Sequence, residues 1–205
     1  MTRTDLIELI SSAFGIPQGT VAEYAKSLSA AGMLTVGLSG PHGHGARMTT
    51  SDVVNVILAC AVNSKRKESD GVLSRESAAE RVRRVRNLRS DESGKTTASP
   101  ADFVPDLPFF HADTAAGAIE AVIDAARTGL VVKWADHKNY FFNVTVENRG
   151  EYVLIGLNIE QKTAICGFGQ PLNPLVERET RLSFMLLALL AKKLGPPDEE
   201  KARNA

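Results

Sequence analysis

The chain of 205 residues has few cysteines, few histidines, no excess of charge and no long hydrophobic run. Its only cysteines, Cys60 and Cys166, lie far apart in apolar surroundings, so we expect buried, reduced thiols and not a disulfide. No apolar run approaches the roughly 18 residues of a membrane-spanning helix. The first residues, Met-Thr-Arg-Thr-Asp, lack the apolar segment of a signal peptide. These absences predict a soluble cytoplasmic protein with no membrane segment.

The histidines form no catalytic or metal-binding pattern. His42 and His44 supply two ligands on a glycine-rich segment, without the neighbouring cysteines or acidic residues of a metal site. Asp136 and His137 with a distant serine do not define a catalytic triad, because such pairs arise by chance. They fit a turn between strands better, where an aspartate forms local hydrogen bonds. We therefore expect no enzyme activity, no bound metal and no cofactor.

Charge is balanced over the whole chain, with 24 Lys or Arg against 24 Asp or Glu, but it is unevenly distributed. From Met1 to Met48 the sum is zero, because three positive side chains face three negative ones. From Asn63 to Lys95 ten positive and six negative side chains leave plus four, the most basic segment of the chain. Positive charge supplies most of the non-specific affinity of a protein for nucleic acid. The basic segment is therefore a candidate phosphate-binding surface.

The stretch from Thr4 to Gly32 predicts two short helices joined by a tight turn. Gly15 and Pro17 end the first helix, and Gly32 ends the second. Paired helices of this kind are typical of a helix-turn-helix. The apolar positions at helical spacing are Leu6, Ile7, Leu9, Ile10 and Phe14, followed by Val21, Ala25 and Leu28.

The residues after the second helix extend this pattern to a winged helix-turn-helix. Met33–Val36 can form a short strand, and the next ten residues hold four glycines and a proline, as in an exposed loop. Residues 15–61 resemble the N-terminal module of uncharacterised phage- and prophage-associated proteins of alphaproteobacteria, which we regard as winged-helix DNA binders. The resemblance covers the first third of the chain and implies no catalytic residue. It depends on Gly15-Ile-Pro, Thr20-Val-Ala, Leu28-Ser-Ala-Ala-Gly-Met-Leu34, the glycine-rich loop and Met48-Thr-Thr.

The resemblance implies that the second helix enters the major groove of double-stranded DNA. Lys26 would bind a phosphate, while the wing, with His42, His44 and Arg47, would contact a neighbouring backbone or the minor groove. Tyr24 has a second interpretation, in which its ring covers the core of the module and its hydroxyl meets water. The outward-facing residues of the helix would be Gln18, Thr20, Glu23, Tyr24 and Ser27.

Two further helices are predicted before residue 90. Thr49 and Asp52 form a capping pattern for a helix that continues to Val62 and is apolar nearly all round, which indicates burial. Residues 74–89 predict a helix with a narrow apolar stripe surrounded by arginines. These arginines either bind phosphates or form a solvated face of their own domain. The arginines assigned to DNA are Arg81, Arg83, Arg84 and Arg86.

The rest of the chain predicts an α+β domain behind a linker. We expect residues 1–64 to form the winged domain, 65–108 the basic helix and a flexible linker, 109–195 the second domain and 196–205 a disordered tail. An antiparallel meander of three or four strands should lie between two helices of the second domain. The expected helices are 113–127 and 175–194, and the expected strands are 130–134, 140–146, 152–159 and 163–168.

Three functions fit this sequence. The first is a sequence-specific DNA-binding regulator of phage or prophage type that forms a homo-oligomer, with a dimer favoured because linked sites raise the effective concentration. The second is a DNA-recognition subunit of a packaging machine, similar to a small terminase, which would form a ring. The third is a protein-interaction adaptor that does not bind DNA.

Overall fold

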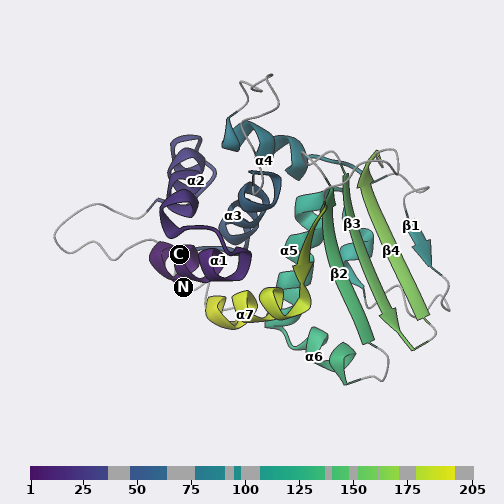
Figure 1. Cartoon of the computed structure of the whole chain (residues 1–205). Helices are drawn as coiled ribbons and strands as arrows, with labels where there is room; N and C mark the ends of the chain where they lie inside the picture. Colours follow the sequence, from purple (N-terminus) through teal and green to yellow (C-terminus); the bar gives the residue numbers. More distant parts are fainter. Residues whose placement is uncertain are drawn as a thin grey trace.

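The computed structural model describes residues 1–36, 47–63, 77–90, 95–97, 107–136, 140–147, 152–160, 162–170 and 179–196. It is an α+β structure in which helices α1 to α4 gather at one side and an antiparallel sheet stands at the other (Figure 1). Helices α5 and α7 lie between the two groups (Figure 1).

The helices begin and end close to the signals in the sequence. In chain order the helices are α1 (Arg3–Phe14), α2 (Gln18–Ala30), α3 (Thr50–Asn63), α4 (Ala78–Arg86), the 3-10 helix η3 (Pro108–His111), α5 (Ala115–Arg127), α6 (Leu130–Ala135) and α7 (Phe184–Leu194). The strands are β1 (Lys95–Thr97), β2 (Tyr140–Glu147), β3 (Tyr152–Ile159), β4 (Lys162–Gly169) and β5 (Glu179–Ser183).

Helices α1 and α2 are the two short helices that the sequence predicts before Gly32, separated by Gly15 to Pro17. Thr2 caps α1 in a capping box with Asp5, since the Asp5 amide donates to Thr2 Oγ1 at 3.2 Å and the Thr2 amide donates to Asp5 Oδ2 at 2.8 Å. Gly15 ends α1 with φ of 63°, a left-handed conformation that glycine adopts without strain. Pro17 then precedes the first residue of α2.

The strand expected at Met33–Val36 is absent, and this prediction is wrong. Side chains of α3 form hydrogen bonds with backbone groups of this segment that would otherwise pair with a neighbouring strand. The Thr35 amide donates to Asp52 Oδ1 at 2.7 Å, and Asn55 Nδ2 donates to the carbonyl of Met33 at 2.6 Å. The glycine-rich loop at 37–46, with His42 and His44, lies outside the described residues.

Helix α3 is buried along nearly its whole length, as its apolar sequence predicts. Every residue from Asp52 to Ala61 is buried. The helix contacts α1, α2, α4, α5 and β2. It therefore lies at the centre of the helical group.

The segment expected to be a flexible linker contributes strand β1 to the fold, and its last residue, Pro108, is the first residue of η3. Strand β1 pairs with the edge of the sheet through Thr96 opposite Ile165, and Phe109 of η3 is fully buried. The ring of Phe109 meets that of Phe142 edge to face, with centroids 6.2 Å apart. These short elements have no periodic sequence pattern, because the sheet and not the local sequence determines their position.

The sheet has the strand order β1-β4-β3-β2-β5 and every pairing in it is antiparallel. Strands β2, β3 and β4 form the predicted meander. The predicted strand at Leu130–Trp134 is instead helix α6, so this prediction is wrong. Its β-branched residues favour a strand, but Val131 is buried within the hydrophobic core from a helix, and packing overrides local preference.

The predicted helix at 175–194 is also partly wrong, because residues 179–183 form β5 and the helix α7 starts only at Phe184. In β5 the buried Leu182 stands between the exposed Arg181 and Ser183, the alternation of a strand. Ser183 then caps α7, since its Oγ accepts from the Leu186 amide at 3.2 Å.

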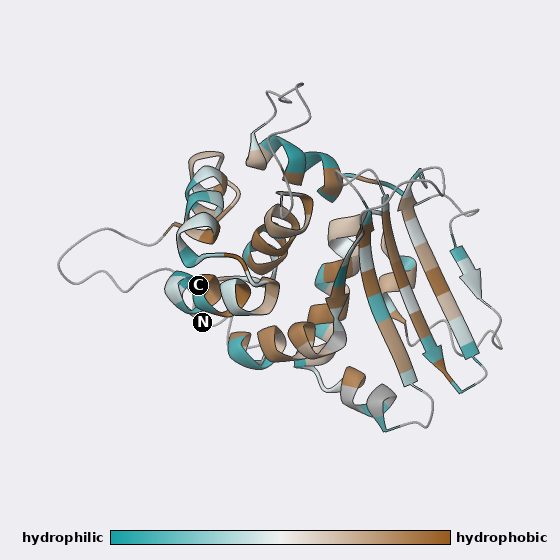
Figure 2. Cartoon of the chain, in the orientation of Figure 1, coloured by the Kyte–Doolittle hydropathy of each residue, from teal (hydrophilic) through white to brown (hydrophobic). Residues whose placement is uncertain are grey.

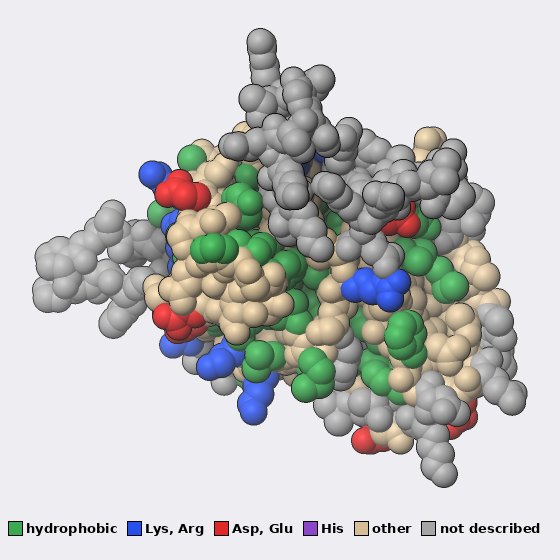
Figure 3. Space-filling model, in the orientation of Figure 1, with side chains coloured by type: hydrophobic (Ala, Val, Ile, Leu, Met, Phe, Trp, Pro, Cys, Tyr) green, Lys and Arg blue, Asp and Glu red, His purple; other side chains and the backbone are tan. Residues whose placement is uncertain are grey.

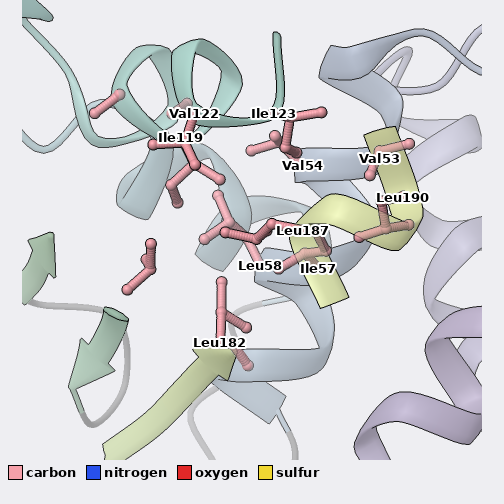
Figure 4. Packing of buried hydrophobic residues seen from close by; sticks show 14 of the residues in the cluster. Val53, Val54, Ile57, Leu58, Ile119, Val122, Ile123, Leu182, Leu187 and Leu190 are labelled. Atoms are coloured by element: carbon pink, nitrogen blue, oxygen red, sulfur yellow. The ribbon is translucent and has the colours of Figure 1, made fainter. Parts of the chain in front are cut away.

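Helices and sheet share one hydrophobic core. The buried residues of α3, α5, α7 and the strands belong to a single cluster. Apolar segments of the helices and strands face this interior (Figure 2). Side chains of α3, α5, β5 and α7 meet in this core, where Leu58 and Leu187 lie side by side between Ile119 and Leu182 (Figure 4). The core therefore continues across the boundary that we predicted at 65–108.

Candidate nucleic-acid interface

Helix α2 presents a polar face to solvent. Its inner residues Val21, Ala25 and Leu28 are fully buried, whereas the side chains that we assigned to DNA lie on the other side or along the flanks. Of these, Gln18, Glu23 and Lys26 are exposed, and Thr20, Tyr24 and Ser27 are half-buried.

Tyr24 lies where α2 meets its neighbours. Its side chain packs against the hydrophobic core. Burial raises the pKa of its hydroxyl, the nearby Cys60 raises it further, and Arg81 lowers it. The ring thus helps to cover the core, as in the second interpretation of this residue, and it lies near an arginine of α4.

Helix α4 lies against α2 and brings arginines next to it. Ser77 and Glu80 form a capping box at its start, with the Ser77 amide donating to Glu80 Oε2 at 2.6 Å. Arg83 Nη2 donates to the carbonyl of Ala31, the C-cap residue of α2, at 2.9 Å. Two elements that are separate in sequence therefore form one surface.

We call this the α2–α4 surface and define it by ten residues. Helix α2 alone contributes no net charge, because Lys26 balances Glu23. On α4 the surface includes three arginines and one glutamate, Glu80. Together with Lys26 and Glu23 of α2, the surface has four positive and two negative side chains, a net charge of plus two. The positive charge that the first helices lack is supplied by α4. The residues are Gln18, Thr20, Glu23, Tyr24, Lys26, Ser27, Glu80, Arg81, Arg83 and Arg84.

Arg86 has a different environment from the other arginines of α4. Its Nη1 donates to Asn55 Oδ1 of α3 at 2.6 Å, and its Nη2 pairs with Glu120 Oε1 of α5 at 3.0 Å. Its side chain is 24% exposed. The guanidinium therefore holds three helices together, and we leave Arg86 out of the surface.

The two ends of the glycine-rich loop are anchored on the helical group. Asp52, which is buried, holds Thr35 at the start of the loop and accepts from the Thr49 amide at 2.8 Å after its end. Arg47 is exposed and forms a β-bridge with Thr2. The described residues on either side of segment 37–46 are thus held by α1 and α3.

The described residues contain no cluster of three or more His, Cys, Asp or Glu side chains that could hold a metal ion. Burial raises the pKa of the Cys60 thiol to about 12, so this thiol is protonated at neutral pH and is a poor nucleophile. Among the described helices none has the length and apolar character of a membrane span.

Comparison of the chain with protein-family models, with curated proteins and with solved structures gives no match. The sequence predicted the polar residues of α2 and the basic character of α4. It did not predict which arginine would turn inward, because the partners of Arg86 lie 31 and 34 residues away along the chain.

Proposed function

We propose that this protein binds double-stranded DNA through the α2–α4 surface. The observation that supports the proposal is the contact between Arg83 and the end of α2, which places a basic helix beside a helix with an exposed polar face. Known helix-turn-helix proteins divide the work in this way, with one helix reading bases and neighbouring groups holding the backbone.

In this proposal α2 lies in the major groove, which is about 12 Å wide and admits a helix. Gln18, Thr20 and Ser27 would form hydrogen bonds with base edges, and Lys26 would contact a phosphate. Arg81, Arg83 and Arg84 would contact the flanking backbone. Since α2 has no net charge, affinity would depend mainly on α4 and would fall with rising salt.

Within this class of DNA-binding proteins, a transcriptional regulator of phage or prophage type fits the sequence resemblance described above. In that role the sheet and helices α5 to α7 would mediate oligomer formation or bind a partner, while the α2–α4 surface would bind DNA. The resemblance supports this finer proposal, and the α2–α4 surface supports only the binding of DNA.

The first test measures the affinity for a mixed-sequence duplex by fluorescence anisotropy over a series of salt concentrations. The double variant Arg83→Ala/Arg84→Ala should bind more weakly to every duplex and lower the salt slope by about two, one for each lost phosphate contact. Lys133→Ala/Lys162→Ala removes two positive charges from α6 and β4, away from the surface, and should leave the slope unchanged. The absence of any salt-dependent binding by the wild-type chain would contradict the proposal.

The second test selects bound sequences from random duplexes. Thr20→Ala/Ser27→Ala should change the preferred sequence and not only the affinity, because these hydroxyls would lie against base edges. If neither this variant nor the arginine variant alters binding, the DNA interface lies elsewhere on the protein.

A further inference from the structure

A groove of about 530 Å³ lies between the C-terminal half of α1 and the junction of β5 with α7. It is lined mainly by apolar side chains, together with Arg181, Ser12 and Ser183. Among the lining residues are Leu9, Ser12 and Phe14 of α1 and Leu186 and Leu189 of α7.

Two large apolar side chains that line this groove also project into solvent. Met185 is 74% exposed and Leu189 is 45% exposed, one helical turn apart on α7. Hydrophobic and positively charged side chains lie side by side over α7 (Figure 3). An apolar groove beside exposed apolar side chains is typical of a protein-binding surface.

Charged residues continue this surface at its other end. Helices α1 and α7 run in opposite directions, because the end of α1 and the start of α7 line the groove together, while Asp5 near the start of α1 lies close to Lys193 near the end of α7. Hydrogen bonds from the Thr2 amide and hydroxyl lower the pKa of the Asp5 carboxyl, with smaller contributions from the N-terminal amino group and from Lys193 near the end of α7. The exposed Asp5 of α1 therefore lies near the exposed Lys193 of α7, and the exposed Glu8 and Lys192 follow close to them along the same two helices.

We propose that this surface, formed by α1 and α7, binds a second copy of the chain about a two-fold axis parallel to both helices. Helix α7 of each copy then packs antiparallel against α1 of the other. Met185 and Leu189 enter the apolar part of the other copy's groove, and Lys192 and Lys193 face its acidic residues.

A second copy fits better than an unrelated partner because the surface complements itself. An isologous interface needs both halves of each contact on the same patch. Here the groove and the side chains that can fill it are adjacent, as are the positive and negative groups. With 12 residues in α1 and 11 in α7, the helices are about 16 to 18 Å long at 1.5 Å per residue. This short contact should give a dimer that depends on concentration.

Sedimentation velocity over a range of concentrations tests the dimer in the absence of DNA. The wild-type chain should approach twice its 22.1 kDa mass. Met185→Glu should raise the dissociation constant of the dimer by about tenfold or more, because it places a charge where the dimer would bury an apolar side chain. The matched control is Phe141→Glu, which changes an apolar side chain of β2 that is 60% exposed and should not alter association.

A charge exchange tests the orientation of the helices. Lys192→Glu/Lys193→Glu should weaken the dimer by placing like charges together, and the further change Glu8→Lys should partly restore it. Three outcomes would overturn the proposal: the wild-type chain is a monomer at every concentration, it forms a ring of eight or more chains, or Met185→Glu does not change the dissociation constant of the dimer. Because DNA binding is measured separately with variants of α2 and α4, either proposal can fail without the other.

Discussion

The ring of Tyr152 lies against Gly167 of strand β4. A Cβ atom added to Gly167 would lie 2.5 Å from Tyr152 Oη and 3.1 to 3.2 Å from two ring carbons. Burial raises the pKa of Tyr152, with smaller effects from Glu147 and Cys166. The ring covers a strand glycine, which offers no side chain of its own for packing.

Gly167→Ala should therefore lower the free energy of unfolding by about 1 to 3 kcal/mol, the usual cost of overpacking. Urea denaturation followed by circular dichroism measures this change. In a Tyr152→Ala background the same substitution should cost clearly less, because the ring that it meets has gone. Gly156→Ala is the matched control, since its Cβ would approach only the movable amide tip of Asn143, at 2.8 Å. Equal costs for Gly167→Ala in both backgrounds would contradict this explanation.

At the scale of the element, helix α4 has arginines with two different roles. Arg86 bonds Asn55 and Glu120 and fixes α4 against α3 and α5. Arg83 is exposed and bonds the backbone of Ala31 at the end of α2. The first contact holds the interior of the fold, and the second lies on its surface.

Arg86→Ala should lower the free energy of unfolding by about 1.5 to 3 kcal/mol, the range for hydrogen bonds to charged groups. Arg83→Ala should cost less than about 1 kcal/mol, because water can replace an exposed donor. Thermal and urea unfolding of both variants measure the difference. If Arg83→Ala lowers the stability as much as Arg86→Ala does, the contact of Arg83 with α2 is structural. The Arg83 variant would then be a poor probe of DNA binding.

Elements with strong local signals could be predicted from the sequence. Terminal glycines and apolar spacing predicted α1 and α2, a capping pattern predicted α3, and β-branched and aromatic residues predicted β2 to β4. The prediction of a strand at Leu130–Trp134 was wrong, because a short apolar run with β-branched residues fits a strand as well as a buried helix. Strand β1 was missed because its position depends on the free edge of β4, which no local pattern records.

The candidate site shows the same limit. The polar face of α2 follows from helical spacing, and the basic character of α4 follows from its composition. Their adjacency could not be predicted, because Arg83 and its partner Ala31 are 52 residues apart. The groove beside α7 was also missed, since four of its nine lining residues come from α1, far away in the sequence.

At the scale of the whole molecule, a buried arginine connects the helical group to the rest. The side chain of Arg127 is only 2% exposed. Its Nε donates to the carbonyl of Gly195 at 2.6 Å and its Nη2 to that of Pro196 at 3.1 Å. Its Nη1 donates to Thr50 Oγ1 at 2.9 Å. One guanidinium thus joins the first turn of α3, the end of α5 and the residues that follow α7.

Because of this contact and the shared core, we expect the helices α1 to α4 and the sheet to unfold in one cooperative step. Arg127→Met should lower the free energy of unfolding by about 1.5 to 3 kcal/mol, the range for hydrogen bonds to charged groups, since it removes the donor that joins Thr50, Gly195 and Pro196. Hydrogen exchange should show the same loss of protection in α1 to α3 and in β2 to β4. The control Lys26→Met changes an exposed cation of α2 and should shift stability by no more than about 0.5 kcal/mol. If Arg127→Met destabilises the sheet alone and leaves α1 to α3 protected, the helical group folds independently, as the domain boundary predicted at 65–108 requires.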